Sequence, residues 1–298
     1  MKRLSSIPAP WLAVAATLGS ITSLCLGSSY AKTLFPALGA QGATALRLAC
    51  GAAVLVLFWR PWRWPLAWRD AGRIARYGLV LGAMNLLFYE AIARIPLGLA
   101  IAIEFTGPLV VAIASSRRAM DFLWIGFAVL GLGLLLPIHP GGSHLDPVGI
   151  AFALAAAVCW GLYILAGQRL GGIPSGQASS LGMLLAALLV LPMGAAPAAV
   201  AFSQPWLLLA GLAVGVLSSA IPYSLELFAL KRLPKHTFSI LLSMEPAIGA
   251  LIAMGVLHER LSPVEWLAIA SVVVASAGST LGLPQAAPAE APSQANLS

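Results

Sequence analysis

Ten apolar runs, each about twenty residues long, dominate this sequence of 298 residues. A run of this length suits an α-helix that crosses the hydrocarbon core of a bilayer. Only 9% of the residues are charged, which is too few to cover the surface of a soluble domain. We expect spans at residues 11–30, 40–59, 74–93, 97–115, 122–139, 148–167, 177–195, 206–229, 236–257 and 263–283. The sequence therefore predicts an all-α polytopic membrane protein, and it excludes a soluble enzyme, a disordered chain and a secreted disulfide scaffold.

Lysine and arginine are unevenly distributed between the two sets of predicted loops. Lys32, Arg94 and Arg260 fall on one side and Arg47 lies within a span, whereas the remaining basic residues fall on the other side. Cytoplasmic loops carry the excess of basic residues, so we expect both termini to be cytoplasmic. The net charge of +7 then reflects topology and does not indicate a nucleic-acid partner. Residues 285–298 are expected to form a short disordered cytoplasmic tail.

The two halves of the chain resemble each other at a constant offset. Residues 91–96 match residues 229–234, and the same offset relates Pro108 to Pro246. We therefore expect ten transmembrane helices in two five-helix repeats, at residues 1–140 and 147–284. Because five is odd, the second repeat must enter the membrane from the opposite face. Inverted repeats are typical of transporters that use alternating access, with the substrate site near the bilayer midplane.

Prolines interrupt three of the predicted spans. Pro108 and Pro246 occupy equivalent positions of spans four and nine, and Pro222 lies in span eight. A proline removes a backbone donor and displaces the carbonyl four residues earlier. An ordinary kink relieved by neighbouring helices is the alternative, but paired interruptions beside carboxylates favour a transport site with these prolines as helix breaks or gates.

Charged side chains inside a bilayer cost about 2.5–3.5 kcal/mol each, and several fall well inside predicted spans. They are Arg47, Glu90, Glu104, Glu226 and Glu245. Arg47 and Glu104 share a depth and could form a structural ion pair, whereas Glu90 is close enough to a span end to reach interfacial water. One arginine faces several carboxylates, so some of the acids must be protonated or must await a cation. A zwitterionic substrate would supply one charge of each sign.

A carboxylate that the substrate vacates could carry a proton back, which predicts a proton-coupled antiporter. The candidates for this role are Glu104, Glu226 and Glu245. Uncharged polar residues at similar depths extend the predicted site, although each could instead serve helix packing. The predicted substrate-binding residues are Arg47, Asn85, Glu104, Thr106, Trp160, Tyr163, Ser243 and Glu245. Neither the cysteines nor the histidines have the spacing of a metal site, and we expect no metal and no cofactor.

Several short segments resemble the drug/metabolite transporter superfamily with its EamA domains. They are residues 31–36 (AKTLFP), 44–49 (TALRLA), 104–109 (EFTGPL), 115–118 (SSRR), 167–169 (GQR), 217–226 (LSSAIPYSLE) and 243–247 (SMEPA). Within the superfamily the chain is similar to the bacterial inner-membrane exporters of threonine and homoserine. The resemblance implies proton-driven efflux of such amino acids across the inner membrane, with Arg47, Glu104, Glu226 and Glu245 as functional positions.

Other functions stay open at this stage. An exporter of another metabolite or drug could use the carboxylates to bind an organic cation, and a passive facilitator would show no uphill transport. An enzyme is not expected, because no nucleophile–base pair or metal-binding pattern occurs inside the spans. The expected partners are an amino-acid substrate, protons and the lipid bilayer. A homodimer also stays open.

Overall fold

The structure is a computed structural model that describes residues 9–114, 120–135, 145–170, 172–222, 225, 229 and 241–281. All regular structure in these residues is helical, as predicted. The longer helices are α1 (Ala9–Thr33), α2 (Phe35–Trp59), α3 (Trp68–Ile92), α7 (Pro147–Gln168), α8 (Ser175–Ala198) and α14 (Pro263–Leu281). The shorter ones are α4 (Leu97–Glu104), α5 (Thr106–Ala114), α6 (Met120–Leu135), α9 (Val200–Ser203), α10 (Pro205–Gly215) and α13 (Glu245–Val256). A 3₁₀ turn occupies Pro61–Arg63 and a π-helical turn occupies Val216–Ala220.

The helices carry the apolar surface that a membrane protein requires. Four helical stretches are long and apolar enough to cross a bilayer, namely Trp11–Thr33, Phe35–Arg63, Pro147–Gly167 and Ser175–Ala198. Shorter apolar helices overlap the expected spans at 97–115, 122–139, 206–229, 236–257 and 263–283. Many large apolar side chains face outward, including Trp68, Phe122 and Phe202. The count of ten spans and their inverted arrangement stay predictions. The predicted tail and Glu226 lie outside the described residues.

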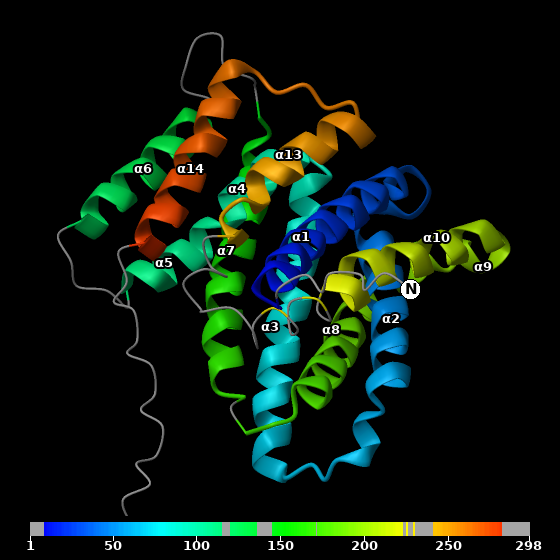
Figure 1. Ribbon diagram of the computed structural model, residues 1–298. Helices are drawn as coiled ribbons and strands as arrows, with labels where there is room; N and C mark the ends of the chain where they lie inside the picture. Colours follow the sequence, from blue (N-terminus) through cyan, green and yellow to red (C-terminus); the bar gives the residue numbers. More distant parts are fainter. Residues whose placement is uncertain are drawn as a thin grey trace, which may run out of the picture.

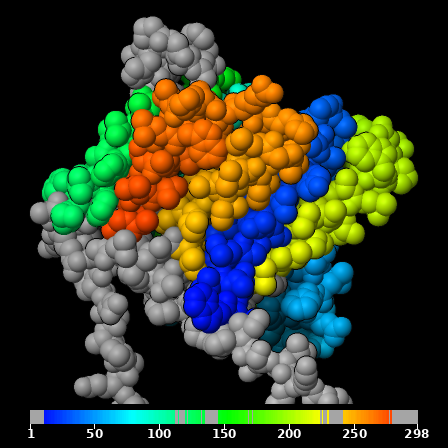
Figure 2. Space-filling view, turned by 45° about the horizontal axis from the view of Figure 1, so that its top comes forward, coloured from blue at the N-terminus to red at the C-terminus, as the bar shows by residue number. Residues whose placement is uncertain are grey.

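Helices from the two halves of the chain pack against one another. α2 packs along α8, and α3 packs along both α7 and α8. α6 and α14 form a pair at one edge of the molecule (Figure 1). In Figure 2 the helices α6, α14, α13, α1 and α10 lie side by side across one face. The largest buried cluster accordingly contains residues from both halves, such as Leu99 and Ala250.

Helices end or begin next to two of the predicted prolines, Pro108 and Pro246. α4 ends at Glu104 and α5 begins at Thr106, two residues before Pro108. α13 begins at Glu245, so that Pro246 falls in its first turn, where the missing N–H leaves no helical hydrogen bond unmade. Each break therefore places a glutamate at a helix terminus inside the molecule.

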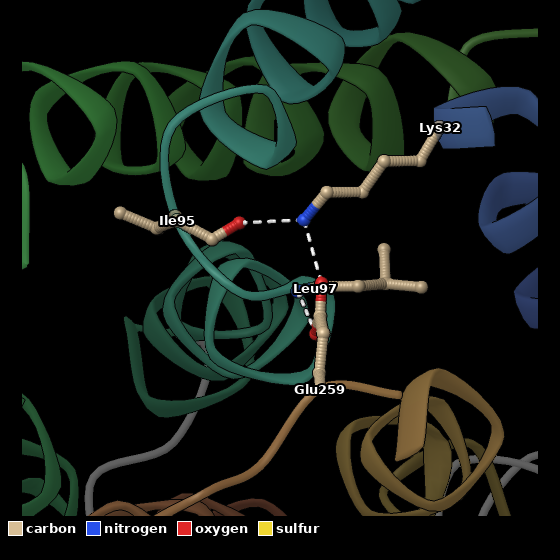
Figure 3. A network of polar contacts seen from close by, with 4 residues as sticks. All are labelled: Lys32, Ile95, Leu97 and Glu259. Atoms are coloured by element: carbon tan, nitrogen blue, oxygen red, sulfur yellow. Dashed lines mark hydrogen bonds and ion pairs between the residues drawn. The ribbon is translucent and has the colours of Figure 1, made fainter. Parts of the chain in front are cut away.

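An ion pair joins α1, α4 and the segment after α13 at one end of the molecule. The Lys32 Nζ donates to Oε1 of Glu259 at 2.6 Å and to the Ile95 carbonyl at 3.2 Å (Figure 3). The other carboxylate oxygen of Glu259 accepts a hydrogen bond from the Leu97 N–H at 2.9 Å. This bond satisfies one of the free N–H groups at the start of α4. A single carboxylate thus holds three segments together.

Candidate substrate site

A cavity lies where α1, α2, α3, α4, α7 and α13 meet. The lining residues are Leu24, Cys25, Ser28, Arg47, Met84, Asn85, Phe88, Ile101, Glu104, Trp160 and Glu245. Apolar walls therefore surround a few charged and polar groups, which is the usual composition of a small-molecule site.

Three charged side chains reach this cavity from three different helices. Arg47 comes from the middle of α2, Glu104 from the last position of α4 and Glu245 from the first position of α13. They are 4%, 7% and 6% exposed, respectively. The two helix breaks thus bring the two carboxyl groups to the same cavity as the arginine.

Neutral groups hold the Arg47 guanidinium. Its Nε donates to Oγ of Ser218 at 2.7 Å, and its Nη2 donates to the Ser218 carbonyl at 3.1 Å. Its Nη1 donates to Oδ1 of Asn85, whose amide nitrogen in turn donates to the Leu81 carbonyl at 2.8 Å. The guanidinium also lies over the Tyr89 ring, with Cζ 5.1 Å from the ring centroid. Donors, acceptors and the aromatic face together fix the orientation of the arginine.

No ion pair of 4 Å or less joins Arg47 to an acidic side chain in the part of the chain that the structure describes. The structural ion pair between Arg47 and Glu104, which their common depth allowed, is therefore not formed here. The cation and the carboxyl groups share one cavity without neutralising each other directly. Groups of opposite charge therefore face one cavity.

The other predicted site residues divide into two groups. Asn85 and Trp160 line the cavity, and the Trp160 ring packs edge-on against Phe105 at 5.2 Å between centroids. Thr106, Tyr163 and Ser243 do not line it. The Thr106 hydroxyl donates to the Ile103 carbonyl at 2.6 Å, and the Tyr163 hydroxyl lies 2.9 Å from that of Tyr77.

Ser243 is fully buried just before α13. Glu90 lies outside the cavity, with Oε2 3.7 Å from Nη2 of Arg94. Pro222 lies two residues after the π-helical turn, and its carbonyl accepts a hydrogen bond from the Ser20 hydroxyl at 3.2 Å.

Comparisons with known proteins identify the family of this chain. Residues 147–281 match the family model of the EamA-like transporter family. The threonine/homoserine exporter RhtA of Escherichia coli strain K12 is 48% identical, over 91% of this chain and 92% of its own length. This chain belongs to the EamA-like transporter family. RhtA of Salmonella typhimurium strain LT2 is 49% identical over the same shares of the two chains.

Two more distant similarities accompany those of this EamA-like transporter to RhtA. The uncharacterized inner membrane transporter YedA of Escherichia coli strain K12 is 27% identical over 63% of each chain. A solved crystal structure superimposes with a TM-score of 0.55 over 90% of this chain and 96% of its own, at 23% identity. That likeness shows a common fold.

Several cavity residues of this EamA-like transporter were missed from sequence. Leu24, Cys25 and Ser28 come from α1, and Met84 and Phe88 flank the predicted Asn85 on α3. Apolar and small residues of this kind resemble ordinary packing residues of a span, so the sequence gives little signal for them. Ser218, which binds Arg47, could have been found from the sequence. It lies four residues before Pro222, which cannot donate a hydrogen bond to its carbonyl.

Proposed function

We propose that this protein is a secondary active exporter of small amino acids such as threonine and homoserine. The observation that carries the proposal is the cavity, in which Arg47 keeps neutral partners beside Glu104 and Glu245. The relatives named as threonine/homoserine exporters, at 48% and 49% identity, support this class of substrate. Membership of a family of membrane transporters also favours transport over catalysis.

The charges of the cavity match a zwitterion. The substrate carboxylate would bind the Arg47 guanidinium, whose planar set of donors suits a carboxylate. The substrate ammonium would bind at Glu104 and Glu245, the carboxyl groups that line the same cavity. Leu24, Ile101 and the apolar walls around them would contact the short side chain.

Proton antiport follows from the surplus of carboxyl groups. When the amino acid leaves, the buried Glu104 carboxylate loses a cationic partner while a second carboxylate, Glu245, lines the same cavity, and two buried like charges repel each other. Uptake of a proton would relieve this repulsion and allow the empty carrier to return. Glu226 is a further candidate for the proton-carrying group.

Alternating access is the proposed mode of movement. We propose ten spans in two inverted repeats, residues 1–140 and 147–284, with both termini cytoplasmic in the bacterial inner membrane. Broken helices at equivalent positions of two repeats favour a transport site with alternating access. Pro108 and Pro246 would mark the moving breaks, and the Lys32–Glu259 ion pair would close the external end. The name of YedA as an inner membrane transporter supports the location.

Transport in inside-out membrane vesicles tests the proposal. Vesicles with and without the protein receive a pH gradient, acid inside, and labelled homoserine or threonine outside. We expect uphill uptake that a protonophore abolishes. A matched pair of variants, Glu104→Gln in the cavity and Glu90→Gln outside it, separates the site from general effects of removing a carboxylate.

Each other result has a defined meaning. Uptake that equilibrates but never runs uphill would replace the antiporter with a passive facilitator. Absence of uptake of either amino acid by folded protein would refute the substrate assignment and favour another metabolite. An equal loss in Glu104→Gln and Glu90→Gln would contradict the site.

A further inference from the structure

The π-helical turn at Val216–Ala220 changes the backbone hydrogen bonding before Pro222. The Ile221 N–H donates to the Val216 carbonyl, five residues earlier. Pro222 has no N–H, so it cannot donate to the carbonyl four residues earlier, Ser218, or to the one five residues earlier, Leu217. Two successive carbonyls therefore lack a donor at position 222.

Side chains from two other helices bind these two carbonyls. The Leu217 carbonyl accepts a hydrogen bond from the Ser23 hydroxyl of α1 at 2.6 Å. The Ser218 carbonyl accepts one from Nη2 of Arg47 at 3.1 Å. Interruptions of this kind are tolerated within a membrane where neighbouring side chains satisfy the freed backbone groups. Here one of those side chains is the arginine of the cavity.

Ser218 contacts Arg47 twice. Besides its carbonyl, its hydroxyl oxygen accepts a hydrogen bond from Nε of Arg47 at 2.7 Å. The same hydroxyl donates its hydrogen to the Val214 carbonyl, which turns the oxygen lone pairs toward the guanidinium. Ser218 is only 1% exposed. This one residue thus binds two of the three guanidinium nitrogens.

We propose that Ser218 is a positioning residue for Arg47, and that Pro222 serves by leaving the Ser218 carbonyl available. The pair holds the guanidinium toward the cavity with neutral acceptors, so its positive charge stays available for the carboxylate of a substrate. A carboxylate at this position would orient the arginine equally well but would neutralise it. The inference rests on the proposed function, because it assigns the carboxylate of the transported amino acid to Arg47.

Three variants separate hydrogen bonding from packing. Ser218→Ala removes the hydroxyl, whereas Ser218→Cys keeps a side chain of similar size with a much weaker acceptor. Ser23→Ala is the matched control, because it removes a hydrogen bond to the same interrupted turn without touching Arg47 or the cavity.

Kinetics of homoserine uptake in vesicles give the first readout. We expect Ser218→Ala and Ser218→Cys to raise the apparent KM roughly tenfold, as expected for loss of a hydrogen bond to a charged group. The maximal rate per folded transporter should change less than about twofold, and Ser23→Ala should leave KM unchanged. A Ser218→Cys protein with a normal KM, or the same rise in Ser23→Ala, would overturn the proposal.

A second readout requires no substrate. In ¹⁵N-arginine-labelled protein in nanodiscs, the Arg47 Nε–H resonance is assigned by its absence in Arg47→Lys. We expect slow solvent exchange of this proton in the wild type and in Ser23→Ala, and fast exchange in Ser218→Ala and Ser218→Cys. Slow exchange in Ser218→Ala would overturn the positioning role. If wild-type vesicles take up no homoserine, the proposed function fails while this measurement still decides the role of Ser218.

Discussion

Removal of the Glu259 carboxylate should open one end of the transporter. The group makes an ion pair with Lys32, whose side chain is 22% exposed against 14% for Glu259. A pair of this exposure contributes about 1 kcal/mol. Glu259 also accepts the N–H of Leu97 at the start of α4, and loss of such a helix cap costs about 1 kcal/mol more. Glu259→Gln should therefore raise the open population about fivefold, and Glu259→Ala about thirtyfold.

Labelling of Cys25 can measure this population. Cys25 lines the cavity and is 1% exposed, so a thiol reagent reaches it only when an end opens. For this assay the protein carries both Cys50→Ala and Cys159→Ala, which leaves Cys25 as its remaining cysteine. Whole cells are treated from outside with a membrane-impermeant thiol reagent. We expect the labelling rate to follow the open population, with the order wild type, Glu259→Gln, Glu259→Ala.

An exposed ion pair provides the control for this experiment. Within α3, Nη1 of Arg73 lies 3.0 Å from Oδ1 of Asp70, and the Asp70 and Arg73 side chains are 31% and 47% exposed. Asp70→Asn should therefore leave the rate of Cys25 labelling unchanged. An unchanged rate in folded Glu259→Ala would refute the reasoning. Faster labelling only from the opposite face, measured in inside-out vesicles, would reverse the proposed orientation of the ion pair.

Three further substitutions test the site and the packing around it. Arg47→Lys keeps the charge but loses the planar set of donors, so the apparent KM for homoserine uptake should rise at least about tenfold. Glu104→Gln should abolish uptake driven by a pH gradient, and exchange of labelled for unlabelled homoserine should persist if the residue carries the proton. A Cβ at Gly107 would collide with the Ala157 carbonyl oxygen, so Gly107→Ala should lower the thermal midpoint by several degrees, measured by differential scanning fluorimetry.

The positions of the helices could be predicted because apolar length alone specifies them. The expected span at 148–167 lies within α7, Pro147–Gln168, and the expected span at 177–195 lies within α8, Ser175–Ala198. The break after Glu104 could be anticipated because Pro108 cannot donate to its carbonyl. These inferences depend on local chemistry, which a single sequence contains.

The rotation of each helix about its axis could not be predicted. Thr106 lies next to the break between α4 and α5 and is 8% exposed. Its hydroxyl nevertheless donates to the backbone carbonyl of Ile103, outside the cavity. Tyr163 is one turn from Trp160 but contacts Tyr77. Which face of a helix meets the cavity depends on close contacts between helices, such as Gly107 against Ala157, and the sequence of one chain does not state these pairings.

The contact between Ser218 and Arg47 could be predicted only in part. The rule that directs attention from Pro108 to Glu104 directs it equally from Pro222 to Ser218. Sequence reasoning can therefore identify the freed carbonyl. It cannot identify Arg47 as the group that binds it, because the two residues are 171 positions apart and only packing of α2 against the π-helical turn joins them.

The contacts of Arg47 explain how a buried cation can be stable without a carboxylate partner. A buried cation is expensive without partners, and a carboxylate partner would compete with the substrate for it. Ser218 and Asn85 instead satisfy three of its hydrogen bonds with neutral oxygens, and Tyr89 contributes its ring face. Because Glu104 and Glu245 line the same cavity without pairing with the arginine, a zwitterion can enter by adding charges of both signs. In the proposed antiport, release would require only that a proton replace the substrate ammonium at a carboxyl group of the cavity.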